Sequence, residues 1–166
     1  MADNLFPTLE HDHASCVDMA VDKARELCKD KSVKLTPLRE AVLRVLLSSH
    51  KALGAYDIIE ALKYGGRQLA PISAYRVIDV LVEAGLVHRL ESKNAYFACL
   101  SDHDDERSLL ILVCEGCARV AEAEAQDVWK SIADLTRSSG FRVNNTVLEI
   151  QGYCAECCKK SAAASS

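Results

Sequence analysis

The feature that most constrains the fold is a predicted helix followed at once by a predicted β-hairpin, within residues 70–99. Ser73 is a favourable N-cap and Gly85 a favourable helix stop, so a helix is expected over residues 74–84. Two short alternating runs flank Ser92-Lys93-Asn94, which is typical of a hairpin. This order favours a winged helix-turn-helix, in which the helix enters the DNA major groove and the hairpin lies against the backbone.

The predicted helix separates an apolar stripe from a polar face. The polar face carries Ser73, Arg76 and Asp79, and arginine is the side chain that most often contacts guanine. The stripe recurs at intervals of three and four residues, and it consists of Ala74, Val77, Ile78, Leu81 and Ala84. One face is therefore expected in the core and the other against DNA.

Three further helices are predicted before this stretch. The first covers about residues 14–30 and the third covers residues 55–64. The second begins with Thr36 as N-cap and Pro37 in the first turn, where the missing N–H of proline has no cost. With the helix and hairpin they complete a winged-helix domain at residues 14–99.

The charge distribution supports DNA as a partner. Residues 21–93 hold 13 Lys and Arg against nine Asp and Glu, a net of +4. Residues 1–20 and residues 94–166 carry −4 each, so the whole chain is at −4. The positive part coincides with the DNA-reading pattern, as binding to phosphates requires.

The expected compartment is the cytoplasm. No apolar run approaches the roughly 18 to 20 residues that span a bilayer, and the N-terminus lacks the basic and apolar parts of a signal peptide. Neither a membrane partner nor a small-molecule substrate is expected. The eight cysteines then indicate metal binding, because cytosolic thiols are kept reduced.

The two ends of the chain are predicted as flexible tails, at residues 1–13 and residues 159–166. His11, His13 and Cys16 are spaced closely enough to bind a metal. The favoured interpretation is a polar tail that runs into the first helix, and a further metal there is left open.

An acidic linker at residues 100–107 leads to a second, smaller domain at residues 108–158. A unit with so little core needs a metal or a partner subunit. Its expected elements are a strand at 109–113, a strand at 119–122, a helix ending near Gly140 and a strand at 142–150. The whole chain is therefore predicted to be an α+β protein.

Two cysteine pairs, Cys114-x-x-Cys117 and Cys154-x-x-Cys157, mark this second domain. Four thiolates suit tetrahedral Zn²⁺ with Zn–S distances of about 2.3 Å. A single pair can also be a redox dithiol, but the βαβ setting of that chemistry is missing. Structural zinc is the favoured interpretation, and Cys158 remains as an exposed thiol.

A second set of candidate ligands is less closely spaced. His88 and Cys99 fall on opposite strands of the predicted hairpin, His103 falls in the linker, and Glu122 ends a strand of the second domain. Taken singly, each has a simpler interpretation: His88 as a strand residue, Cys99 as core, and the other two as solvated surface. Their spacing alone leaves both interpretations open.

These motifs resemble the ferric uptake regulator superfamily and, within it, the zinc uptake regulators. The resemblance covers about residues 18–157. It is carried by Leu35-Thr36-Pro37-x-Arg39, Ala55-Tyr56-Asp57-Ile58, Ser73-x-Tyr75-Arg76, the run from Gly85 to Cys99 and both cysteine pairs. It implies a winged-helix repressor that forms a homodimer through its C-terminal α/β domain and binds operator DNA of zinc-uptake genes when loaded with zinc.

The resemblance also implies two zinc ions per subunit and a set of DNA contacts. The structural zinc would be held by Cys114, Cys117, Cys154 and Cys157. The regulatory zinc would be held by His88, Cys99, His103 and Glu122. The residues that match DNA-contacting positions are Tyr56, Ser73, Tyr75 and Arg76.

The alternative within the superfamily is an iron- or peroxide-responsive regulator. Cys99 disfavours it, because a thiolate with imidazole and carboxylate prefers Zn²⁺ to Fe²⁺. The iron sensors carry a His-His-x-His run where this chain has Ser101-Asp102-His103-Asp104. Asp104 and Asp105 are therefore competing ligands to His103.

An enzyme is the third interpretation, and the sequence disfavours it. The chain has no deaminase His-x-Glu pattern and no Gly-Ser nucleophile motif. Four cysteine ligands also leave no open position on zinc for a substrate.

Overall fold

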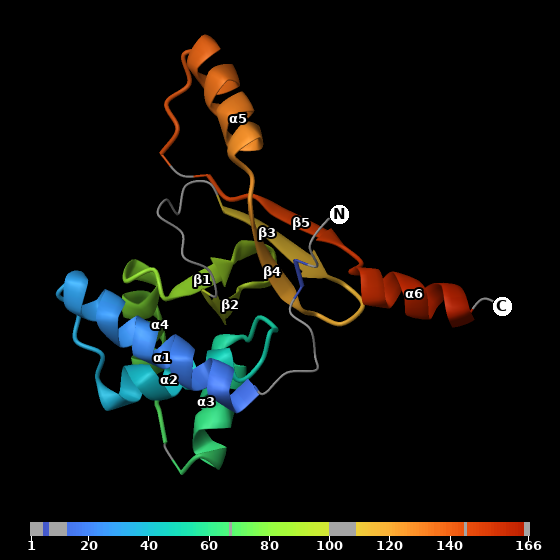
Figure 1. Cartoon of the computed structure of the whole chain (residues 1–166). Coiled ribbons are helices and arrows are strands. Elements are labelled where there is room, and N and C mark those ends of the chain that lie inside the picture. The colour runs from blue at the N-terminus through green and yellow to red at the C-terminus, as the bar shows by residue number, and fades with distance from the viewer. Residues whose placement is uncertain (1–4, 7–12, 67, 100–108, 145, 165–166) are drawn as a thin grey trace. The chain divides into compact units, whose positions relative to one another are not determined.

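The computed structural model describes residues 5–6, 13–66, 68–99, 109–144 and 146–164 (Figure 1). They divide into two compact units, one formed by Pro7–Leu100 and the other by Met1–Phe6 with Ser101–Ser166. The predicted His103 and the linker around it lie outside the described residues. Helices and strands occur in both units, which confirms the α+β class. None of the helices within the described ranges has the length and apolarity to cross a membrane.

The unit Pro7–Leu100 begins with three helices, α1 (His13–Asp30), α2 (Pro37–Leu47) and α3 (Ala55–Tyr64). Thr36 caps α2 as predicted: its hydroxyl accepts from the Arg39 amide at 3.4 Å. Each helix turns an apolar stripe inward, and the buried side chains form one core that α4 and the hairpin also join. The largest fully buried members include Leu43, Leu46, Ile58, Ile78 and Leu81.

The helix α4 (Pro71–Glu83) starts three residues earlier than expected. The prediction of Ser73 as its N-cap is wrong: Ala70 holds that position, and Ser73 lies in the first turn. The reason is Pro71, whose fixed φ and missing N–H suit the first helical position. The C-terminal end is as predicted, with Gly85 at a φ of 71° just beyond the helix.

The hairpin pairs β1 (Val87–Leu90) with β2 (Ala95–Ala98) in antiparallel register. A short 3-10 turn, Glu91–Lys93, joins them, and Asn94 closes it in the left-handed region at a φ of 47°. Asn94 also accepts a hydrogen bond from Arg89 at 3.0 Å. The helix followed by this hairpin is the predicted winged arrangement.

The other unit is built on a three-stranded sheet in the order β4-β3-β5. The central strand β3 (Leu109–Cys114) pairs antiparallel with β4 (Val120–Glu124) and parallel with β5 (Glu149–Gly152). Between β4 and β5 the chain forms α5 (Gln126–Ser138), as expected for a parallel crossover.

Two expectations for this unit are wrong. The third strand was expected over residues 142–150, but β5 has four residues, because only those lie in register with β3. The chain also continues past the second cysteine pair as α6 (Ala155–Ala164), where a tail was expected from residue 159. Alanine and lysine dominate that stretch, and both are strong helix formers.

Candidate metal centres and nucleic-acid interface

The fold brings the two cysteine pairs together in the unit that contains the three-stranded sheet. The four sulfurs of Cys114, Cys117, Cys154 and Cys157 lie within 4.8 Å of one another. The distance from Cys117 Sγ to Cys154 Sγ is 3.9 Å. A tetrahedral Zn²⁺ with Zn–S bonds of about 2.3 Å needs sulfurs about 3.8 Å apart. The donor set and its spacing therefore fit a zinc ion.

The backbone around the first pair is shaped to admit the second. Gly116 lies where a side chain would collide: an added Cβ would be 2.9 Å from Cys157 Sγ and 3.0 Å from Cys157 Cβ. Ala118 closes the turn at a φ of 61°, and its amide donates to the Cys114 carbonyl at 2.8 Å. The Cys154 amide donates to Cys114 Sγ at 3.3 Å, which ties the two pairs directly.

The electrostatics of the cluster favour thiolates at some positions and thiols at others. Burial raises the pKa of Cys114, but backbone N–H groups of Cys154 and Cys117 donate to its sulfur and bring the pKa down to about 6. Burial raises the pKa of Cys157 to about 12, and hydrogen bonds with the neighbouring thiols add to the rise. A bound Zn²⁺ would displace the retained protons, since only thiolates are ligands.

Two charged residues that the sequence analysis missed lie against these sulfurs. Arg119 is buried and donates to Cys117 Sγ and Cys154 Sγ, and it forms an ion pair with Glu156 at 2.6 Å. A signal was available: Arg119 follows the first pair by two residues, and Glu156 stands inside the second pair. Once the pairs meet, the opposite charges meet as well.

The structure also brings together the two candidate ligands of the hairpin. A ligand nitrogen of His88 and the sulfur of Cys99 lie within 4.8 Å of each other. The His88 ring packs on Phe97, with ring centroids 5.5 Å apart. The Cys99 amide donates to the Leu86 carbonyl at 3.0 Å, which fixes the chain just after β2. Imidazole and thiolate together are a donor pair that suits zinc.

The remaining candidate ligands are distributed over other parts of the chain. Glu122 lies in the middle of β4, opposite Ile111 of β3, and belongs to the other unit. His103, with the competing Asp104 and Asp105, lies outside the described residues. On α1, Cys16 is exposed, and His11 lies outside the described residues.

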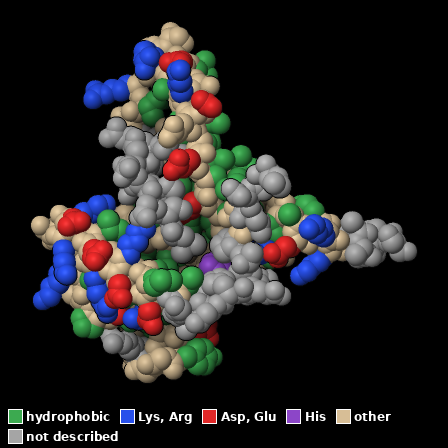
Figure 2. Space-filling model, in the orientation of Figure 1, with side chains coloured by type: hydrophobic (Ala, Val, Ile, Leu, Met, Phe, Trp, Pro, Cys, Tyr) green, Lys and Arg blue, Asp and Glu red, His purple; other side chains and the backbone are tan. Residues whose placement is uncertain are grey.

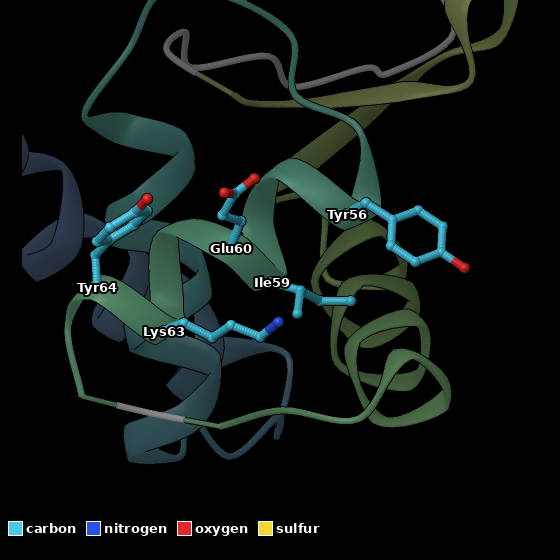
Figure 3. Close-up of a pocket in the computed structure, with 5 residues that line it drawn as sticks. All are labelled: Tyr56, Ile59, Glu60, Lys63 and Tyr64. Carbon is cyan, nitrogen blue, oxygen red and sulfur yellow. The ribbon is translucent and has the colours of Figure 1, made fainter.

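The candidate DNA-contacting residues lie on α3 and α4. On α4, Arg76 is exposed, Tyr75 is 36% exposed, and Ser73 is half-buried in the first turn. On α3, Tyr56 is 69% exposed and projects from the first turn (Figure 3). Exposed arginine and tyrosine side chains on α3 and α4 are suited to contact base edges and phosphates.

Tyr56 also lines a hollow on the surface of α3. The other lining residues are Ile59, Glu60, Lys63 and Tyr64, which Figure 3 shows along the helix. The hollow is open and carries both a cationic and an anionic group, so it resembles a surface groove more than an enclosed ligand site.

The winged helix, the sheet unit and the four-cysteine cluster together define a metal-binding regulator. The model of the ferric uptake regulator family matches residues 30–151, and the chain belongs to this family. It is 33% identical to the zinc uptake regulation protein of Escherichia coli strain K12, over 81% of this chain and 79% of that protein. It is 29% identical to the peroxide operon regulator of Bacillus subtilis strain 168, over 83% and 93%.

Solved structures agree with this assignment. The structure of a zinc uptake regulator in complex with zinc and DNA superposes with a TM-score of 0.82 at 32% sequence identity. The match covers 88% of this chain and 97% of that one. Both the winged helix and the sheet unit therefore have counterparts in a DNA-bound relative.

Proposed function

We propose that this protein is a zinc-responsive, homodimeric transcriptional repressor. It is located in the cytoplasm and binds operator DNA when its regulatory site holds zinc. In this way it controls genes for zinc uptake. The observation that carries the proposal is the thiol–imidazole pair of His88 and Cys99, which lies on the wing of a DNA-reading fold. The zinc uptake regulators among its relatives support the same conclusion.

Two zinc ions per subunit have different roles in this proposal. The four-cysteine cluster holds a structural ion, since its ligands come from one unit and leave no open position. His88, Cys99, His103 and Glu122 hold the regulatory ion. Among these proposed ligands, His88 and Cys99 come from the wing and Glu122 comes from β4 of the sheet unit. The proposed protein has no catalytic step.

Regulation follows from differential binding. Zinc can favour the DNA-competent arrangement only if it binds that arrangement more tightly than the alternatives. To change the ratio of DNA-competent to incompetent protein from 1:99 to 99:1, zinc must bind the competent arrangement about 5.5 kcal/mol more tightly. A complete set of four ligands can supply this energy, because structural zinc sites contribute on the order of 10 kcal/mol or more.

The DNA contacts assign a role to each exposed group. Arg76 reads a guanine in the major groove, Tyr56 and Tyr75 contact bases or sugars, and Ser73 donates to a phosphate near the start of α4. The hairpin carries Lys93 at its exposed turn, and this lysine contacts the phosphate backbone of the DNA.

Dimerisation is proposed through α5 and the edge strand β5. The amphipathic α5 has no buried residue, although its apolar stripe includes Val128 and Leu135 at 45% and 70% exposed. Phe141 and Ile150 are exposed as well. Apolar surface of this extent is typical of a protein interface, and the partner is a second copy of the chain.

Metal analysis with DNA selection tests the proposal. Duplexes selected from a random library by the zinc-loaded protein are titrated before and after mild chelation. We expect two zinc ions per subunit, one easily removed, and DNA binding that is lost with that ion. Binding that depends on iron or manganese would instead support the iron- or peroxide-responsive alternative, and binding that is independent of metal would contradict both.

A further inference from the structure

Arg119 stands out in the sheet unit because its charge is buried. It is 2% exposed, and it is the one buried charged side chain among those that the structure describes. A buried guanidinium is unfavourable unless several acceptors surround it. The acceptors that Arg119 reaches are therefore informative about what the site is built to hold.

Among the described residues, those acceptors include two sulfurs and one carboxylate. Nε donates to Cys117 Sγ at 3.2 Å, and Nη2 donates to Cys154 Sγ at 3.4 Å. Nη2 also donates to Glu156 Oε2 at 2.6 Å, and Nη1 lies 3.5 Å from Glu156 Oε1. Arg119 thus contacts one sulfur from each cysteine pair, and Glu156 holds the guanidinium in place. The planar fork of arginine allows this arrangement, whereas an ammonium group has no matching geometry.

The charges explain why an arginine belongs here. Four thiolates around one Zn²⁺ carry a net charge of −2, and a buried anion of that kind needs compensation. Hydrogen bonds from a charged donor to an ionised acceptor are about twice as strong as neutral ones. Neutral thiols or a disulfide would be poor acceptors for the same guanidinium. The surroundings of Arg119 therefore fit a metal-bound set of thiolates.

We propose that Arg119 is a positioning residue of the four-cysteine zinc centre, which bridges the two cysteine pairs and draws electron density from two of the bound thiolates. This inference rests on the structural zinc of the proposed function. It makes Arg119 responsible for slow release of the ion, because groups that hydrogen-bond to ligands orient them and tune the bound metal.

The test uses the full chain with Arg119→Met, which removes the donors and keeps a long apolar side chain. Zinc transfer to 4-(2-pyridylazo)resorcinol is followed with time, and Co²⁺ is substituted into the site for spectroscopy. We expect zinc transfer at least about tenfold faster. We also expect the sulfur-to-cobalt charge-transfer band at longer wavelength, because thiolates without hydrogen bonds are easier to oxidise. A purely structural role would leave the band in place.

Two further variants make the outcome decisive. Arg119→Lys keeps the buried charge but reaches fewer acceptors, so intermediate values are expected for both readouts. It also serves if Arg119→Met does not fold. The matched control is Arg137→Met, on the exposed surface of α5, which should leave both readouts unchanged. Wild-type band positions and transfer rates in both Arg119 variants would overturn the inference.

The proposed function stands or falls on separate readouts. If the Arg119 variants behave as expected while DNA binding of the wild type ignores zinc, the repressor proposal fails and this inference survives. If the wild type binds DNA in response to zinc while the Arg119 variants release zinc as the wild type does, only the inference about Arg119 is contradicted.

Discussion

At the scale of single residues, Gly116 shows how tightly the cysteine cluster is built. Gly116→Ala places a Cβ 2.9 Å from Cys157 Sγ, closer than such atoms approach. We expect the unfolding free energy of the sheet unit to fall by about 1–3 kcal/mol, as in overpacked cores, and zinc to be lost more readily. Thermal unfolding with metal analysis measures both effects. Gly152→Ala is the control, since nothing lies within 4 Å of its added Cβ.

Arg76 carries the base readout in the proposed complex. Arg76→Ala should weaken binding to the selected duplex by about 1–3 kcal/mol and relax the preference at one purine per half-site. Competition titrations with single-base variants of the duplex measure the preference. Uniform weakening on every sequence would identify Arg76 as a phosphate anchor, and Arg137→Ala controls for the loss of a charge.

Residue-level prediction had a clear limit in the sheet unit. The four cysteines were predictable, because the zinc-ligand spacing is visible within each pair. The role of Arg119 was harder to predict. Its position after the first pair and that of Glu156 inside the second pair were a signal, but the burial of Arg119 depends on both pairs meeting in space. Within the winged helix, Ser73 was assigned to the cap because its type suits that position, while Pro71 decided where the helix begins.

At the scale of elements, a network of ion pairs connects α1 to α2. Glu40 of α2 accepts from Arg25 of α1 at 2.9 Å and from Arg44 at 3.1 Å. Arg44 in turn pairs with Asp18 of α1 at 2.8 Å. Charges of both signs accordingly alternate over α1 and α2 on the surface seen in Figure 2.

The pH dependence of this contact follows from Glu40. Hydrogen bonds from Arg44 and then Arg25 lower its pKa below the usual 4.5. A lowered carboxyl pKa stabilises the fold above the unfolded value, and that contribution is lost as the pH falls through the folded value. Glu40→Gln should therefore cost about 0.5–1 kcal/mol at pH 7, and this difference should shrink as the pH falls below the ordinary carboxyl value of 4.5.

Denaturant unfolding of the wild type and Glu40→Gln at several pH values checks this expectation. The exposed Glu26 of α1 provides the control substitution, Glu26→Gln. A stability difference that stays constant down to pH 3 would mean that Glu40 acts through packing and not through its charge.

The exposed stripe of α5 makes the dimer testable at one position. Leu135→Glu puts a carboxylate into the proposed interface, where it loses its hydration. We expect dimerisation to weaken by at least about 2 kcal/mol, the scale of an interface hot spot. Sedimentation velocity at several concentrations measures this. Lys130→Glu puts a carboxylate on the exposed side of α5 that faces away from Leu135 and should remain dimeric, whereas an unaffected Leu135→Glu dimer would move the interface elsewhere.

The elements themselves were largely predictable from periodicity and capping. The helices α1, α2, α3 and α5 and the hairpin lie close to their expected positions, because each has an apolar stripe or a turn signal of its own. The short β5 was less predictable. Its length is set by its register with β3, which is a property of the sheet and not of the local sequence.

At the scale of the whole molecule, one zinc ion is proposed to act as a regulator and the other as a structural ion. Cys114→Ser should remove the structural zinc, unfold the sheet unit and abolish the dimer. Cys99→Ser should leave the structural zinc, the dimer and the melting temperature close to those of the wild type. The same substitution, cysteine to serine, is therefore expected to have different effects at the two proposed sites.

The most direct test is a DNA-binding titration at buffered free zinc for the wild type, Cys99→Ser and the exposed control Cys158→Ser. We expect the wild type and Cys158→Ser to respond at the same free zinc concentration. Cys99→Ser should need more than about tenfold more zinc or should not respond at all. A Cys99→Ser protein with an unshifted zinc response would contradict the account, because the wing thiol would then be a core residue and not a ligand of the sensing site.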